Sequence, residues 1–149
     1  MYKNYKKEMI KLFKYDKVNK MYWTSTTIDN KSCVIAFEKY KGDNINETNV
    51  YSVAFGIGAN RKQVLSWLFG KCNYIEMKIT GTGNLKPLIW AKNMLFEFEK
   101  FIVNNNKNEV IKIAVSGEDE RRYRAYKSYL IKHGYKSNIA DNELTKLIK

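Results

Sequence analysis

The segment Tyr74 to Ile102 constrains the fold most, because its hydrophobic period changes once along its length. Residues 74 to 79 form a short apolar-rich run that is typical of a strand. Thr80 to Asn84 break the pattern. From Leu85 onward apolar residues recur at the spacing of an amphipathic helix, namely Leu88, Ala91, Leu95, Phe98 and Ile102. Pro87 falls in the first helical turn, where its missing N–H needs no partner. The sequence therefore predicts a strand, a glycine turn and a long helix.

The glycine turn is a candidate anion-binding site. The first N–H groups of a helix have no partner within it, and the helix dipole adds about half a positive charge there. Gly81 and Gly83 allow a phosphate to approach the backbone closely. The same glycines equally suit a tight turn that binds nothing, so both interpretations stay open. Gly56 and Gly58, which precede a second predicted helix, form a rival site of the same kind.

A resemblance to a known family extends this interpretation. The run Lys78-Ile79-Thr80-Gly81-Thr82-Gly83 is similar to the Arg/Gln-x-x-Gly-x-Gly/Ala signature of the GNAT superfamily of acyl-CoA N-acyltransferases. That signature also lies between a central strand and a long helix. The chain resembles small GNAT-like proteins of bacteriophages more closely, which continue with a strand and an Arg/Tyr-rich helix ending in Gly-Tyr. The corresponding segments here are Val110 to Ser116, Arg122 to Tyr126 and Gly134-Tyr135, and the match covers roughly Val50 to Ser137.

The resemblance implies an α/β (α+β) fold with a mixed, largely antiparallel sheet, splayed central strands and helices on both faces. It implies one domain over residues 1–149, with an acyl-CoA-binding core at 74–137. The implied activity moves an acetyl group from acetyl-CoA to an amine on an unknown acceptor. The residues implied to bind the cofactor are Lys78, Ile79, Thr80, Gly81, Thr82, Gly83, Asn84 and Arg122.

Three side chains are candidates for catalysis. Tyr126 matches the phage-like Arg-x-Arg-x-Tyr pattern and is the candidate acid for the departing thiolate, with Tyr129 as the alternative. A tyrosine, whose pKa is about 10, protonates a thiolate within hydrogen-bond reach. Glu76 is the candidate base, acting directly or through water. Each has a structural interpretation beside the catalytic one: half-buried helix aromatics for the tyrosines, and a solvent-facing or salt-bridged carboxylate for Glu76.

The charge balance supports a second hypothesis. The chain carries 27 basic and 15 acidic side chains, a net charge of +12, which attracts nucleic acid, acidic proteins or phosphorylated cofactors. Lys78 also stands where the signature has Arg or Gln. The alternative function is therefore a catalytically inactive GNAT-fold protein that binds a host protein or nucleic acid, as a phage takeover or counter-defence factor. A general solvated surface explains the lysine excess better than a dedicated nucleic-acid face does.

Composition excludes several classes of protein. Hydrophobic residues make up 44% of the chain, which argues against intrinsic disorder. No apolar run reaches the roughly 18 to 20 residues of a membrane span, and the first residues have no signal-peptide core. We therefore expect a cytoplasmic protein, in the host cell if it is phage-encoded. Cys33, Cys72 and His133 are too few and too scattered for a metal site, and we expect both thiols to be reduced.

The remaining segments predict a basic amphipathic helix at 1–20 and alternating strands and helices thereafter. The helix suits docking on a membrane or RNA, or on the sheet through its apolar side. The other predicted elements are strands at Met21–Ile28, Ser32–Tyr40, Asn49–Gly56, Val110–Val115 and Tyr135–Ile139, helices at Arg61–Gly70 and from Glu118 to Gly134, and a terminal helical turn at Glu143–Ile148. Asp29-Asn30-Lys31 is predicted to form the turn between the first two of these strands.

Overall fold

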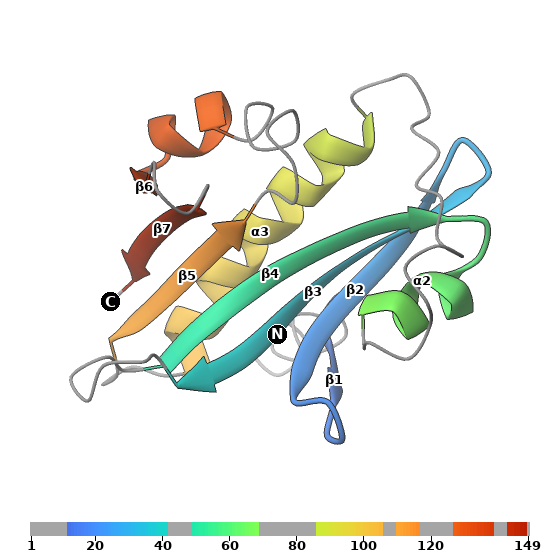
Figure 1. The fold of residues 1–149 in the computed structure, drawn as a ribbon, viewed down its shortest axis with the longest axis horizontal. Coiled ribbons are helices and arrows are strands. Elements are labelled where there is room, and N and C mark those ends of the chain that lie inside the picture. The colour runs from blue at the N-terminus through green and yellow to red at the C-terminus, as the bar shows by residue number, and fades with distance from the viewer. Residues whose placement is uncertain are drawn as a thin grey trace, which may run out of the picture. The chain divides into compact units, whose positions relative to one another are not determined.

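A computed structural model describes residues 12–41, 49–68, 86–105, 110–116, 127–138 and 143–148. Within them, seven strands form one sheet in the order β1-β2-β3-β4-β5-β7-β6 (Figure 1). The strands are β1 (Lys14–Asp16), β2 (Met21–Ile28), β3 (Lys31–Lys41), β4 (Asn49–Gly58), β5 (Ile111–Ser116), β6 (Lys136–Asn138) and β7 (Glu143–Ile148). Helix α2 covers Arg61–Leu68, helix α3 covers Lys86–Asn105, and residues 127–132 are also helical.

The predicted α+β class with a mixed, largely antiparallel sheet is confirmed, and the described residues contain few helices. Three pairs with a defined register, β1–β2, β5–β7 and β6–β7, are antiparallel. The pair β4–β5 is parallel, from Val50 opposite Lys112 to Val53 opposite Val115. The chain forms two compact units, one from Met1–Phe37 and Phe55–Ile102 and the other from Glu38–Ala54 and Val103–Lys149.

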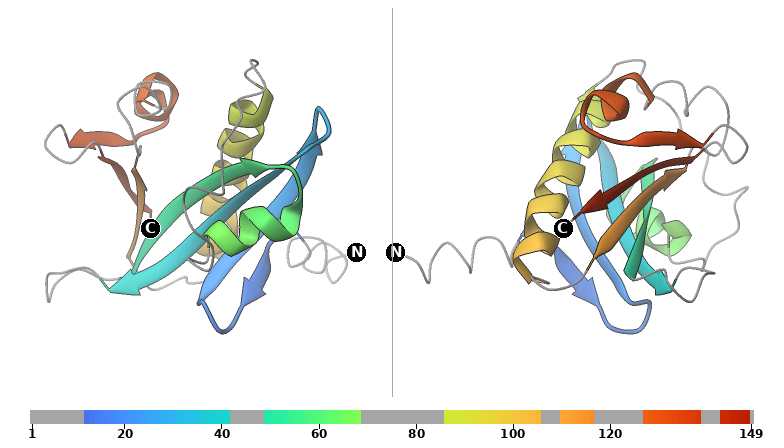
Figure 2. Two further views of the ribbon diagram at one scale, coloured as in Figure 1. Left: turned by 45° about the vertical axis from the view of Figure 1, so that its right-hand side comes forward. Right: turned by 90° about the vertical axis from the view of Figure 1, so that its left-hand side faces the viewer.

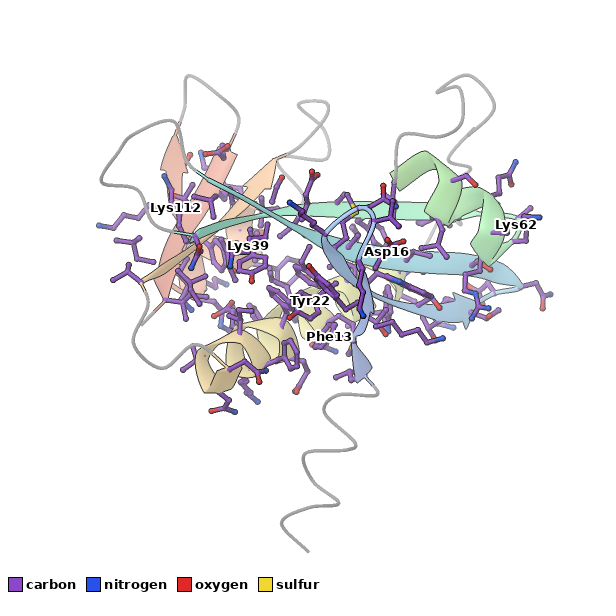
Figure 3. The ribbon with its side chains drawn as sticks, turned by 90° about the horizontal axis from the view of Figure 1, so that it is seen from below. Phe13, Asp16, Tyr22, Lys39, Lys62 and Lys112 are labelled. Atoms are coloured by element: carbon purple, nitrogen blue, oxygen red, sulfur yellow. The ribbon has the colours of Figure 1, made fainter. Side chains whose placement is uncertain are left out.

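Stacked aromatic rings hold α3 on the sheet in the first unit. The rings of Phe37 on β3 and Phe98 on α3 are stacked, with centroids 3.8 Å apart and planes inclined by 4°. Phe13 meets both rings edge-on, at 5.8 and 5.4 Å. Tyr22 on β2 packs against Phe98 and Phe101, and Figure 3 shows Phe13 and Tyr22 reaching toward α3. The predicted helical stripe is therefore the buried side of α3.

Helices α2 and α3 lie on opposite sides of the strands of the first unit (Figure 2). Side chains alternate between the two faces of a strand, so Phe55 and Gly58 of β4 face opposite ways. Phe55 lies 6.4 Å from Trp90 of α3, measured between ring centroids. A Cβ atom on Gly58 would lie 2.7 Å from Val64 Cγ2 of α2. Each face of β4 is thus covered by its own helix.

Part of the predicted N-terminal helix is wrong, because Lys14–Asp16 form strand β1 and residues 17–20 form a turn. Tyr15 pairs directly with Tyr22 of β2, and their ring centroids are 4.7 Å apart. The Asp16 carboxylate accepts hydrogen bonds from the N–H groups of Val18 and Asn19, at 2.9 and 3.0 Å. The helical spacing therefore ends at Phe13, after which alternate residues face opposite sides. Residues 1–11 lie outside the described residues.

Strands β2 and β3 are joined by the turn that the sequence predicts. Asp29 and Asn30 both have positive φ, at 51° and 64°. A two-residue hairpin loop with positive φ at both positions is a type I′ turn, whose twist matches that of the flanking strands. Asn and Asp tolerate this backbone region better than most residues other than glycine. Strand β2 has the predicted bounds, Met21–Ile28.

In the second unit, Glu143–Ile148 is strand β7 and not the predicted helical turn. It pairs antiparallel with β5 on one side and with β6 on the other. Leu144 and Ile148 are buried at a spacing of four, which resembles a helical period. Lys146 occupies the position between them on the same face, with its ammonium group 5.6 Å from the centroid of the Tyr135 ring. Because a lysine fills this position, the two-residue period of the strand is not visible in the sequence.

Gly134 ends the helical residues 127–132, as the sequence predicts. Its φ is +94°, and its N–H donates to the carbonyl of Ile131 at 3.2 Å. The N–H of Tyr135 donates to the carbonyl of Leu130 at 3.0 Å. These two bonds form a Schellman motif, in which Leu130 and Tyr135 supply the accompanying apolar positions. Both side chains are buried.

The aromatic cluster predicts a pH dependence of stability. Burial, and secondarily the nearby Tyr15, raise the pKa of Tyr22 above its ordinary value of 10.0. The folded state therefore keeps the phenolic proton at pH values where the unfolded state loses it. The contribution of Tyr22 to the free energy of unfolding is constant below about pH 10 and falls as the pH rises further.

We expect Tyr22→Phe to weaken this loss of stability in alkali. The measurement is the free energy of unfolding in urea, for wild type and variant, from pH 8 to pH 11. The free energy of unfolding of wild type minus that of the variant should be constant below about pH 10 and should fall above it. A difference that stays constant over this range would contradict the prediction.

Candidate functional site

The amino end of α3 is the candidate site, because the predicted glycine turn leads directly into it. Helix α3 begins at Lys86, and Pro87 is fully buried in its first turn, as predicted. The first turn contains no acidic residue. The helix dipole and the Lys86 ammonium group therefore both favour a negative charge at this end.

Two contacts fix the amino end of α3 within the first unit. The Lys86 ammonium group lies 4.0 Å from the Asp29 carboxylate of the β2–β3 turn. Both side chains are exposed, so this ion pair contributes little to stability. One turn further along α3, Trp90 packs against Phe55 in the carboxyl-terminal half of β4. An anion at this helix end would therefore lie near the end of β4 and the β2–β3 turn.

Most of the predicted site residues lie outside the described residues. They are Glu76, Lys78, Ile79, Thr80, Gly81, Thr82, Gly83, Asn84, Arg122 and Tyr126. The predicted strand at residues 74–79 also lies there. Tyr129 is described: it is in the helical residues 127–132 of the second unit, and 43% of its surface is exposed. Its neighbour Leu130 is buried, so Tyr129 lies on the outer side of this helix.

The rival glycine site, at Gly56 and Gly58, has a structural explanation. Both residues lie within β4, and neither has a positive φ. Gly58 leaves the space into which the fully buried Val64 packs. Asn60 caps α2, accepting a hydrogen bond from the Gln63 N–H at its side-chain oxygen at 2.9 Å. These glycines therefore serve the close packing of α2 on β4, and the first turn of that helix is occupied by its own cap.

A cysteine nucleophile, a metal site and a membrane-spanning helix all lack support in the described part of the chain. Cys33 is a free thiol buried in β3, and its burial raises the pKa of the thiol, which keeps it protonated. A protonated buried thiol is a poor nucleophile. Within the described residues, no three His, Cys, Asp or Glu side chains are grouped closely enough to bind a metal ion. No helix in the same residues is long and apolar enough to span a membrane.

The contacts made by Asp29, Phe55 and Trp90 were not predicted from the sequence. Asp29 was predicted only as a turn residue, and its proximity to Lys86 depends on how α3 docks on the sheet. Phe55 and Trp90 are far apart in the chain, and alternation in β4 predicts only which face Phe55 occupies. Comparisons of the chain with protein-family models, curated proteins and solved structures find no match.

The packing of α2 predicts a specific coupling between two positions. Gly58→Ala places a methyl group against Val64 Cγ2, so it should reduce the free energy of unfolding by about 1 to 3 kcal/mol. In a Val64→Ala background the added methyl group has room, and Gly58→Ala should cost much less there. A double-mutant cycle in urea measures this difference. An equal cost of Gly58→Ala in both backgrounds would show that Gly58 is needed for something other than this packing.

Proposed function

We propose that the protein is a GNAT-like N-acetyltransferase that moves an acetyl group from acetyl-CoA to an amine. The observation that carries the proposal is the parallel pair β4–β5 in the interior of a mostly antiparallel sheet. A parallel pair needs a long crossover connection, and here α3 lies in that connection. The resemblance implies two central strands that splay apart, with a long helix between them. It places the second of these strands at Val110 to Ser116, where β5 lies, and the first at residues 74–79, outside the described residues. The order of α3 followed by an interior parallel strand supports the proposal.

The charges at the amino end of α3 support binding of the CoA phosphates. The pyrophosphate of CoA is anionic, and the first turn of α3 contains no acidic side chain. The Lys86 ammonium group, which lies 4.0 Å from the Asp29 carboxylate, is exposed and would also meet the phosphates. The backbone N–H groups of Thr80 to Asn84, which precede α3, would hold the pyrophosphate. Bound acetyl-CoA supplies an activated acetyl group as a thioester.

The residues of the chain have three tasks in this proposal. A backbone N–H near Met77 to Ile79 stabilises the negative charge that develops on the thioester oxygen. Glu76, directly or through water, accepts the proton that the amine loses as its nitrogen bonds to the acetyl carbon. The Tyr126 hydroxyl donates a proton to the sulfur as the carbon–sulfur bond breaks. The proton balance is then restored by transfer from Glu76 to Tyr126 through solvent.

Isothermal calorimetry with acetyl-CoA and with free CoA tests the binding part of the proposal. We expect micromolar binding for both ligands, because their phosphates are identical. Gly83→Trp should weaken binding at least tenfold, since the added ring fills the space that a phosphate needs. Val18→Trp is the matched control, because Val18 is 85% exposed in the β1–β2 turn, and it should leave binding unchanged. No binding at millimolar ligand would contradict the proposal.

The two candidate tyrosines can be separated by their phenylalanine variants. Release of CoA is measured with a panel of small amines and lysine peptides as acceptors. Tyr126→Phe should lower the turnover number by about 10²- to 10⁴-fold, because the thiolate leaves without its proton donor. Affinity for acetyl-CoA should not change, and Tyr129→Phe should keep wild-type turnover. Loss of turnover in Tyr129→Phe alone would assign the role of the acid to Tyr129.

A further inference from the structure

A pair of cations shares one tryptophan ring on the first unit, away from α3. Trp23 on β2 lies directly opposite Lys14 on β1. The Lys14 ammonium group is 5.1 Å from the centroid of the Trp23 ring, and the Arg61 guanidinium carbon of α2 is 5.9 Å from it. Three elements therefore meet at this ring, which we call the Trp23 cluster.

Within the described part of the chain, the cations of the Trp23 cluster have no ion-pair partner. Lys14 and Arg61 are both exposed, and among the described residues no carboxylate lies within salt-bridge distance of either. Asp16 is on the same face of β1 as Lys14, but its carboxylate accepts hydrogen bonds from the β1–β2 turn. Two like charges next to each other without a counterion favour an anionic ligand.

Further lysines extend the charge on both sides of the cluster. Lys17 and Lys20 are exposed in the β1–β2 turn, and Lys62 is exposed on α2, where Figure 3 shows it pointing outward. The first turn of α2 contains no acidic residue. The surface formed by β1, its turn and the start of α2 is therefore a basic strip with one aromatic ring in it.

An aromatic ring among cations is a combination that suits single-stranded nucleic acid. Unpaired bases stack on aromatic side chains while Lys and Arg contact the phosphates. Stacking of a base is stronger than an exposed cation–π contact, so a base can replace a cation on the Trp23 ring. The displaced cation then remains beside the phosphate of the same nucleotide. The bases of a duplex are already stacked on one another and cannot stack on Trp23. The carboxylates of an acidic peptide would bind the cations but would not stack on the ring.

We propose that the Trp23 cluster is a binding site for single-stranded nucleic acid. This proposal is independent of the proposed acetyltransferase activity, because it uses none of the residues assigned to acetyl-CoA or to catalysis. Lys14 and Arg61 contact two phosphates, and Trp23 stacks one base. The flanking lysines attract the strand without selecting its sequence.

Fluorescence anisotropy of a labelled 12-nucleotide oligouridylate, titrated with the full chain at several salt concentrations, tests the site. The double variant Lys14→Gln/Arg61→Gln should bind at least tenfold more weakly at low salt. Its slope of log affinity against log salt should be shallower by about 1.4, or about 0.7 for each single-strand phosphate that the variant no longer neutralises. The control Lys100→Gln/Lys132→Gln, which removes the same charge from two exposed positions elsewhere, should change the affinity less than threefold.

The role of the ring is tested separately. Trp23→Leu should lose about tenfold in affinity with an unchanged salt slope, whereas Trp23→Phe should keep most of the affinity, since a base can still stack on phenylalanine. Thermal unfolding curves show whether each variant is folded. If Trp23→Leu does not fold, Trp23→Phe still tests the role of the ring, because it is expected to keep most of the affinity.

Three results would overturn the proposal. The first is an equal loss of affinity in the control double variant, which would show that net charge alone is responsible. The second is equal affinity for an RNA duplex, because a duplex cannot stack on Trp23. The third is competition by oligoglutamate of the same length that depends on Lys14 and Arg61 but not on Trp23, which would indicate an acidic protein as the partner.

Discussion

The stacking of Phe98 on Phe37 is the contact on which the first unit depends. Both rings are completely buried, and Phe13 packs against their edges. Edge-to-face pairs such as those that Phe13 makes with both rings contribute about 0.5 to 1.5 kcal/mol each beyond the area they bury. The position of α3 against β2, β3 and β4 follows from this contact, since Tyr22 and Phe101 pack around it. The amino end of α3, where anion binding is proposed, is therefore set by rings near the other end of the same helix.

The two faces of β4 show how one strand serves two purposes. Phe55 supports the start of α3 on one face, while Gly58 allows α2 to approach on the other. The approach of α2 brings Arg61 over Trp23 and so creates a concentration of positive charge on the face opposite α3. The Trp23 cluster therefore lies on the face of this unit opposite α3, and it includes none of the residues assigned to acetyl-CoA.

The sequence predicted helices and strands well wherever the apolar residues follow a single helical or two-residue spacing without interruption. Strand β2 has its predicted ends, and α3 buries the predicted Ala91, Leu95, Phe98 and Ile102. Prediction failed at Lys14–Asp16 and at β7, where Lys146 stands on a buried face and hides the alternation. The Trp23 cluster was not predictable, because Lys14, Trp23 and Arg61 come from three elements whose contact depends on the fold. The glycine-turn residues lie outside the described part of the chain, so their predicted roles stay predictions.

The outermost strands of the sheet, β1 and β6, are only three residues long, and each includes a lysine, Lys14 and Lys136. An edge strand exposes N–H and C=O groups that can pair with the edge of another molecule, and natural proteins block this with short, charged edges. Here the longer strands, β3 and β4, have a neighbouring strand on both sides, and β5 pairs with Val50 to Val53 of β4. The two outermost strands of the described sheet are therefore short, lysine-containing templates, which disfavours the addition of a foreign strand at either of them.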